Sequence, residues 1–146
     1  MVKRLMVGVV SLLIVVLDQL TKWLVRETVT AAIPLTSFLS LTNIQNTGIG
    51  FGLLQGYGWI LTIVIILIIG GLFWYHPHIP NKLFPQLAYA FIIGGAVGNL
   101  IDRLVFGMVT DFISLSFWPA FNVADTAITL GVIGLLIHYW IRGERE

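Results

Sequence analysis

The sequence predicts a membrane all-α protein of four transmembrane helices, with both termini in the cytoplasm and a small extracytoplasmic β platform. Of its 146 residues, 58% are hydrophobic and only 10% are charged, whereas a soluble domain carries about 25% charged residues. Four apolar stretches are each long enough to cross the hydrocarbon as a helix, which takes about 20 residues and satisfies its own backbone hydrogen bonds. A single domain, 1–146, is expected, with spans near 5–25, 57–75, 84–103 and 121–141.

The first stretch has the features of an anchoring helix that stays on the chain. Lys3 and Arg4 precede the apolar run from Leu5 to Leu17, an order that cleavable signal peptides also show. The run continues through Asp18 to Val25 without a convincing small-residue cleavage site, so an uncleaved helix is predicted. The second stretch contains no charged residue, and the apolar part of the third ends at Ile101.

The basic residues near the span ends predict the orientation, because they favour the cytoplasmic side. More of them fall on the side of the two termini and the short loop 76–82, which are therefore expected in the cytoplasm. The segments 27–56 and 104–120 are expected to face outward. The cytoplasmic set is Lys3, Arg4, Lys82, Arg142 and Arg145, and the outward set is Lys22, Arg26 and Arg103.

The outward segments carry signs of local structure. β-forming and polar residues nearly alternate from Ser37 to Asn46, which favours a short strand or hairpin. Gly48, Gly50 and Gly52 follow and indicate a tight loop whose backbone can be approached closely. The aromatic segment Phe117–Phe121 is typical of an interfacial belt or an amphipathic surface segment.

Four acidic residues, Asp18, Asp102, Asp111 and Asp125, are expected at the outer ends of the spans. An ionised side chain near the bilayer centre costs about 2.5–3.5 kcal/mol, so each acid needs a reason to be there. Asp18 and Lys22 have the i,i+4 spacing of a structural ion pair. Asp111 lies among apolar residues without a basic neighbour, and is either a turn residue or a functional acid.

The remaining polar clusters also allow a structural and a functional interpretation. Asn99, Asp102 and Arg103 are spaced to share a helix face, which suits a structural hydrogen-bond network or a substrate-binding face. Asn122 and Asp125 have the spacing of a helix N-cap with an acid three residues later. Spacing alone does not decide between a structural and a functional role for either cluster.

Other chemistries have less support. The absence of cysteine excludes disulfides, thiolate metal sites and a cysteine nucleophile on this chain. His76, His78 and His138 lie on the cytoplasmic side or inside the last span, away from the acids, so no metal site is expected. No basic stripe for nucleic acid and no nucleotide-binding loop is present, so neither a nucleic-acid partner nor a cofactor is expected.

What remains is a set of carboxylates flanked by asparagines. Two carboxyls held close together cannot both ionise cheaply, so they share one proton. The ionised member can then take a proton from water while the protonated member donates to a carbonyl oxygen. A carboxyl pair of this kind can catalyse hydrolysis without a metal ion.

The chain resembles the bacterial lipoprotein signal peptidases, also called signal peptidase II or prolipoprotein signal peptidase. The resemblance runs from end to end, and five motifs in the same order and spacing carry it. They are DQLTK at Asp18–Lys22, NTGIGF at Asn46–Phe51, GGAVGNLIDR at Gly94–Arg103, VTDFI at Val109–Ile113 and FNVADT at Phe121–Thr126.

The resemblance implies roles for the polar residues. Asp111 and Asp125 match the catalytic aspartate pair of the family. The other matching positions line the site, hold its shape or contact the substrate. They are Asn46, Gly48, Asn99, Asp102, Arg103, Asn122, Asp18 and Lys22.

The resemblance also implies the reaction and its setting. The substrate would be a prolipoprotein whose signal peptide is removed just before a diacylglyceryl-modified cysteine. The enzyme would be a multi-pass protein of the bacterial inner membrane, surrounded by membrane lipid, with its active site near the outer face. Inhibition by the cyclic peptide globomycin is implied as well, and a monomer is expected.

The sequence departs mildly from the family pattern. Ile49 and Gly50 stand where small alanines are usual, and Thr126 stands where serine is common. These changes are expected to alter the fit of the substrate around the loop more than the activity. A rival interpretation is a small transporter or channel component, but its polar residues should be spread through the bilayer, and here the acids cluster at one end. A purely structural membrane protein would explain Asn122 and Asp125 as a cap but would leave Asp111 without a purpose.

Overall fold

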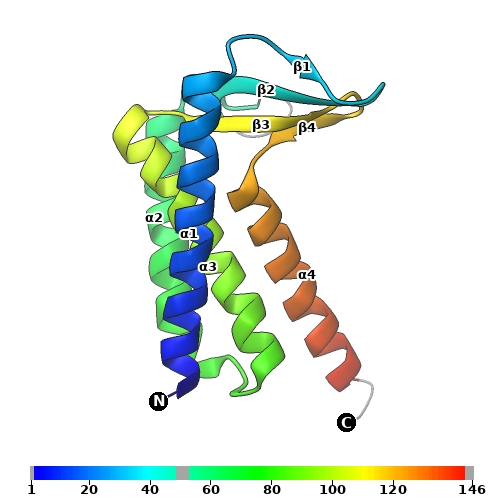
Figure 1. Ribbon diagram of the computed structural model, residues 1–146. Coiled ribbons are helices and arrows are strands. Elements are labelled where there is room, and N and C mark those ends of the chain that lie inside the picture. Colours follow the sequence, from blue (N-terminus) through cyan, green and yellow to red (C-terminus); the bar gives the residue numbers. More distant parts are fainter. Residues whose placement is uncertain (1, 49–52, 144–146) are drawn as a thin grey trace.

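The computed structural model describes residues 2–48 and 53–143, and four long helices lie beneath a small sheet (Figure 1). Each of the four is long and apolar enough to cross a membrane, which confirms the four predicted spans as helices. A turn of 3-10 helix, η2 (His76–His78), connects the second helix to the third. The helices are α1 (Val2–Thr28), α2 (Gly58–Tyr75), α3 (Leu83–Phe106) and α4 (Val123–Gly143).

α3 is the central helix of the bundle. About 67% of its span is buried, against 11 to 22% for the other three, whose apolar side chains face outward. Its glycines allow this close packing. A Cβ at Gly98 would lie 2.7 Å from a carboxylate oxygen of Asp18 on α1, and one at Gly95 would collide with the Ala124 carbonyl of α4. Small residues at such positions let membrane helices approach each other closely.

The sheet is antiparallel, with the strand order β1-β2-β3-β4. Its second strand confirms the strand predicted from Ser37 to Asn46. The predicted glycine loop is described only at Gly48, since Gly50 and Gly52 lie outside the described residues. The strands are β1 (Ile33–Pro34), β2 (Leu39–Asn46), β3 (Val109–Leu115) and β4 (Trp118–Phe121).

The strands β3 and β4 were not predicted. The interpretation of Phe117–Phe121 as an interfacial or surface segment stays a prediction, and Phe117 and Trp118 are exposed. Most of this segment is β4, which pairs with β3 at the edge of the sheet. Pro119 is tolerated there because an edge strand leaves one row of backbone groups unpaired. The first four residues of β3 are all buried, so the strand lacks the apolar and polar alternation that reveals a half-buried strand.

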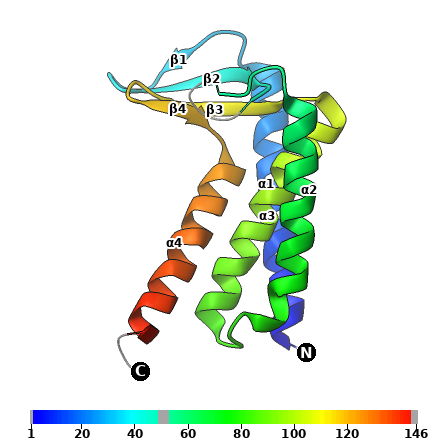
Figure 2. The ribbon, with the colours of Figure 1, turned by 180° about the vertical axis from the view of Figure 1, so that it is seen from behind.

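The sheet lies across one end of the helices, and both ends of the described chain lie at the opposite end (Figure 1). Seen from behind, the sheet also projects sideways over α4 (Figure 2). β2 and β3 pair with Ile44 opposite Asp111, with a register shift between Leu41 and Ile44. Residues far apart in the chain therefore meet where the sheet joins α3 and α4.

Candidate active site

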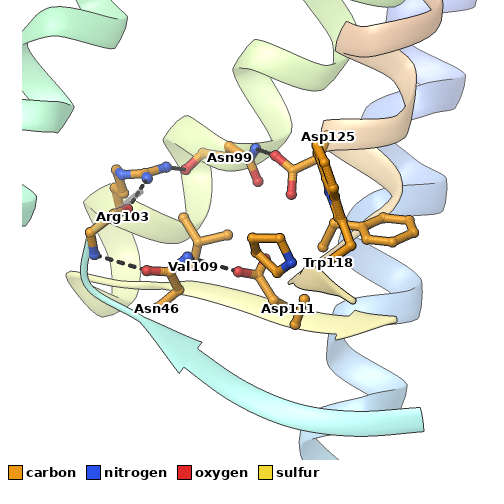
Figure 3. A pocket seen from close by; sticks show the side chains of 11 residues that line it. Asn46, Asn99, Arg103, Val109, Asp111, Trp118 and Asp125 are labelled. Atoms are coloured by element: carbon orange, nitrogen blue, oxygen red, sulfur yellow. Dashed lines mark hydrogen bonds between the residues drawn. The ribbon is translucent and has the colours of Figure 1, made fainter. Parts of the chain in front are cut away.

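A pocket of about 260 Å³ lies where the sheet meets α3 and α4. Six of the ten residues predicted for the site line it. Figure 3 shows Asp111 and Asp125 on different sides of this pocket, with an asparagine beside each carboxylate. The six residues are Asn46, Gly48, Asn99, Arg103, Asp111 and Asp125.

Three asparagine side chains hold the two carboxylates. Asn46 donates through Nδ2 to Asp111 Oδ2 at 2.9 Å, and Asn122 donates through Nδ2 to Asp111 Oδ1 at 2.7 Å. Asn99 donates through Nδ2 to Asp125 Oδ1 at 2.8 Å. Each acid is thus fixed in place, and Asp111, on β3, is only 3% exposed.

Asn122 joins the two acids and also begins α4. Its Oδ1 accepts from the Asp125 backbone N–H at 2.9 Å, and its own N–H donates to Asp125 Oδ2 at 3.3 Å. This reciprocal pair is a capping box. The cap predicted from spacing is therefore present, while the side-chain amide of the same asparagine also holds Asp111. Asn122 therefore has both roles, because it caps α4 and also holds an acid of the site.

Burial raises the pKa of Asp111 to about 6. This pKa already includes a smaller rise caused by the nearby charge of Asp125 and a lowering caused by the hydrogen bonds from Asn46 and Asn122, which stabilise the ionised form. The Asp111 carboxyl therefore stays protonated in weakly acidic solution, up to about pH 6, and it lies beside a second acid in the same pocket.

This raised pKa predicts how stability depends on pH. Between about pH 4 and 6 the folded chain keeps a proton on Asp111 that the unfolded chain releases, so stability falls as pH rises through this window and levels off above it. The loss is at most about 3 kcal/mol. The apparent unfolding temperature of the parent should therefore fall relative to that of Asp111→Asn as the pH rises from about 4 to 6.5, so the difference between the variant and the parent should increase. A difference that does not change with pH would contradict the assignment.

Arg103 and Gly48 close one side of the pocket. The Nη2 group of Arg103 donates to the Gly48 carbonyl at 3.2 Å, and the Gly48 N–H donates to Asn46 Oδ1 at 2.9 Å. The second bond directs the amide nitrogen of Asn46 toward Asp111. A side chain at Gly48 would collide with the Leu53 carbonyl oxygen, so glycine is required for this close approach.

A buried ion cluster lies behind the pocket. Lys22 Nζ is 2.8 Å from Asp18 Oδ2 and 3.3 Å from Asp102 Oδ2, and all three side chains are fully buried. This confirms the predicted pair of Asp18 and Lys22. Asp18 Oδ1 also accepts from the Ala124 N–H at 2.9 Å, so an acid of α1 stabilises the first turn of α4.

The ion cluster also orients Asn99. Lys22 Nζ donates to Asn99 Oδ1 at 2.9 Å. An ammonium group can only donate, so it must face the amide oxygen, and the amide nitrogen of Asn99 is left to face Asp125. Asp18, Lys22 and Asp102 therefore support the pocket without lining it.

Asp102 does not lie beside Arg103 on the face that lines the pocket, as the spacing had suggested. Successive helical residues point about 100° apart, so Asp102 faces α1 while Arg103 faces the pocket. Asp102 accepts from the Thr110 N–H at 3.0 Å and is 3.5 Å from Arg26 Nη1. Its role in the structure is to join α1, α3 and β3.

Several residues of this region were missed at the sequence level. Gln19 Nε2 lies 3.0 to 3.1 Å from oxygens of Asp18, Gly98 and Asp102, and joins α1 to α3. A polar side chain next to Asp18 in an otherwise apolar helix could have indicated this role of Gln19. Trp118 lines the pocket, and no local pattern reveals that. Within residues 2–48 and 53–143, no group of three or more His, Cys, Asp or Glu side chains could hold a metal ion.

Comparison with known proteins identifies the family. The family model described as signal peptidase (SPase) II matches residues 10–141. The chain is 37% identical to a lipoprotein signal peptidase of Halothermothrix orenii, over 92% of this chain and 95% of the relative. It is 41% identical to one from Streptococcus pyogenes serotype M1, over 96% and 95%.

The fold matches solved structures as well. One is described as a bacterial membrane enzyme structure by the in meso method at 2.3 Å resolution. It superposes with a TM-score of 0.86 at 30% identity, over 97% of this chain and 91% of the other. A second, at 1.9 Å resolution, gives a TM-score of 0.79 at 31% identity, over 92% of both chains. The chain therefore belongs to the signal peptidase II family, the lipoprotein signal peptidases.

Proposed function

We propose that this chain is an intramembrane aspartic endopeptidase that removes the signal peptide of diacylglyceryl-modified prolipoproteins, cutting before the lipidated cysteine. Membership of the family implies cleavage of prolipoprotein signal peptides. The observation that supports the aspartic mechanism is the pocket itself, in which Asp111 and Asp125 are each held by asparagine donors. The proposal includes action as a monomer without a cofactor, and inhibition by globomycin-type cyclic peptides.

In the proposed reaction the two carboxyls exchange protons with water and with the peptide. Burial favours the proton on Asp111, so Asp111 is the acid and Asp125 the base. Asp125 takes a proton from water, whose oxygen bonds to the scissile carbonyl carbon while Asp111 protonates the carbonyl oxygen. The C–N bond then breaks as Asp125 returns its proton to the leaving amine and Asp111 recovers one from a hydroxyl. Both acids end in their starting states.

The substrate class can be tested with two forms of one prolipoprotein, which differ only in the diacylglyceryl group on the cysteine. The parent chain, in lipid or detergent, should release the signal peptide from the lipidated form and leave a product that begins with the lipidated cysteine. The mass of that product identifies the cleaved bond. Equal cleavage of both forms, or none of either, would contradict the proposed substrate.

Arg103 is proposed to hold the Gly48 loop against the pocket, because its guanidinium reaches the Gly48 carbonyl from α3. A lysine keeps the charge but lacks the planar fork of donors. Arg103→Lys should lower kcat/KM by about 10- to 100-fold while the apparent unfolding temperature stays close to that of the parent. Parental activity in this variant would remove Arg103 from the working site.

The orientation is also part of the proposal, with both termini in the cytoplasm and the sheet at the outer face. Since the chain has no cysteine, single cysteines report their location without background. A cysteine at Gln55 or Phe106, near the sheet, should react with an impermeant thiol reagent added to intact cells, and one at His78 should not. The reverse pattern would place the pocket on the cytoplasmic side.

A further inference from the structure

We propose that an apolar groove between the sheet and α4 binds an acyl chain of the lipidated cysteine and so sets the enzyme's preference for long lipid chains. The proposal rests on the proposed function, since it concerns that substrate. The groove has a volume of about 390 Å³, within the range of about 300–1,000 Å³ that ligand pockets span. It is separate from the pocket of the two acids but borders it.

The exposed surface of the groove walls is mostly apolar. The sheet supplies Phe117, in the turn between β3 and β4, and Trp118 at the start of β4, which are 72% and 57% exposed. α4 supplies Leu130, two threonines and, at the border with the pocket of the two acids, Asp125. Both threonine hydroxyls are already bonded to the helix, Thr126 to the Asn122 carbonyl at 3.0 Å and Thr129 to the Asp125 carbonyl at 2.8 Å. They therefore need no polar partner from an occupant.

The groove adjoins the place where the proposed chemistry occurs. Trp118, Phe121 and Asp125 line both the groove and the pocket of the two acids. The lipid is attached to the residue directly after the scissile bond. When that bond lies at Asp125, the first atoms of the acyl chains must lie within a few bonds of the pocket, where this groove begins.

Exposed apolar side chains continue along α4 from Leu130, the groove residue farthest along this helix. Leu130, Ile133 and Ile137 follow one another at helical spacing, and they are 54%, 47% and 42% exposed. The sheet extends over the end of α4 that lies nearest to it (Figures 1 and 2). An acyl chain can therefore enter from the bilayer along an apolar path without crossing water.

The test uses Leu130→Trp, which narrows the groove without removing a hydrogen bond. The probes are one prolipoprotein with either dipalmitoyl or dibutyryl glyceryl cysteine, cleaved by the full chain in lipid. The ratio of kcat/KM for the long chain to that for the short chain should fall at least about tenfold in this variant. Thr129→Trp, which fills the same groove, should give the same result. Val132→Trp places the same side chain at an exposed position outside the groove and should keep the parental ratio.

Each other result overturns the proposal. If both substrates slow equally, the groove holds the signal peptide or supports the fold. If neither slows, the groove is unused or holds a resident membrane lipid. Failure of the proposed function would look different, because the parent chain itself would then cleave neither substrate, or would cleave the unlipidated prolipoprotein equally well.

Discussion

Replacing either Asp111 or Asp125 by asparagine should lower the rate constant for cleavage by at least about 10³-fold. Asparagine has nearly the same shape as aspartate but cannot exchange the proton that the proposed reaction requires. The amide oxygen of the new asparagine can still accept one of the two hydrogen bonds that hold each acid, so the pocket should keep its shape and substrate binding should persist. The measurement is single-turnover cleavage of a lipidated prolipoprotein, normalised to the amount of folded protein.

Asp18→Asn is the matched control. Asp18 is an acid from the same end of the bundle, but it is fully buried against Lys22 and does not line the pocket. Its replacement should lower stability or expression and leave measurable turnover per folded molecule. If Asp18→Asn and the two site variants lost turnover equally, the acids of the pocket would have no special role.

Lys22→Met should destabilise the chain by about 3–5 kcal/mol, since it leaves Asp18 as a buried charge without a cation and Asp102 with Arg26 alone. The apparent unfolding temperature in detergent should fall by about 10 °C or more. Turnover should also fall, because the amide of Asn99 loses the ammonium that orients it toward Asp125.

Two further variants check this explanation. Lys82→Met removes a lysine from an exposed position before α3 and should change stability by less than about 0.5 kcal/mol. Adding Asp18→Asn to Lys22→Met removes the buried charge that has lost its cation and should recover part of the lost stability. If Lys22→Met unfolded no earlier than Lys82→Met, the cluster would not carry the energy assigned to it.

The helices could be predicted because a membrane leaves few alternatives. A span needs about 20 apolar residues, and hydropathy alone reveals them. The pair of Asp18 and Lys22 and the cap of Asn122 and Asp125 could be predicted for a similar reason, since each depends on helical spacing within one segment.

The contacts between distant segments could not be derived from local spacing. Asn46 reaches Asp111 only because β2 pairs with β3, and β3 was hidden because its first residues are buried on both faces. The resemblance to a known family supplied the pairing of Asp111 with Asp125. It did not show which way Asp102 faces, because that depends on how α1 packs against α3.

The most direct test of the central claim is a double-mutant cycle on Asp111 and Asp125. The single-turnover rate constants of the parent, Asp111→Asn, Asp125→Asn and the double variant are measured with one lipidated substrate. Because the two acids are proposed to act as one proton-exchanging unit, the double variant should lose little more than either single variant. Losses that multiply, or a single variant that cleaves as fast as the parent, would contradict the account.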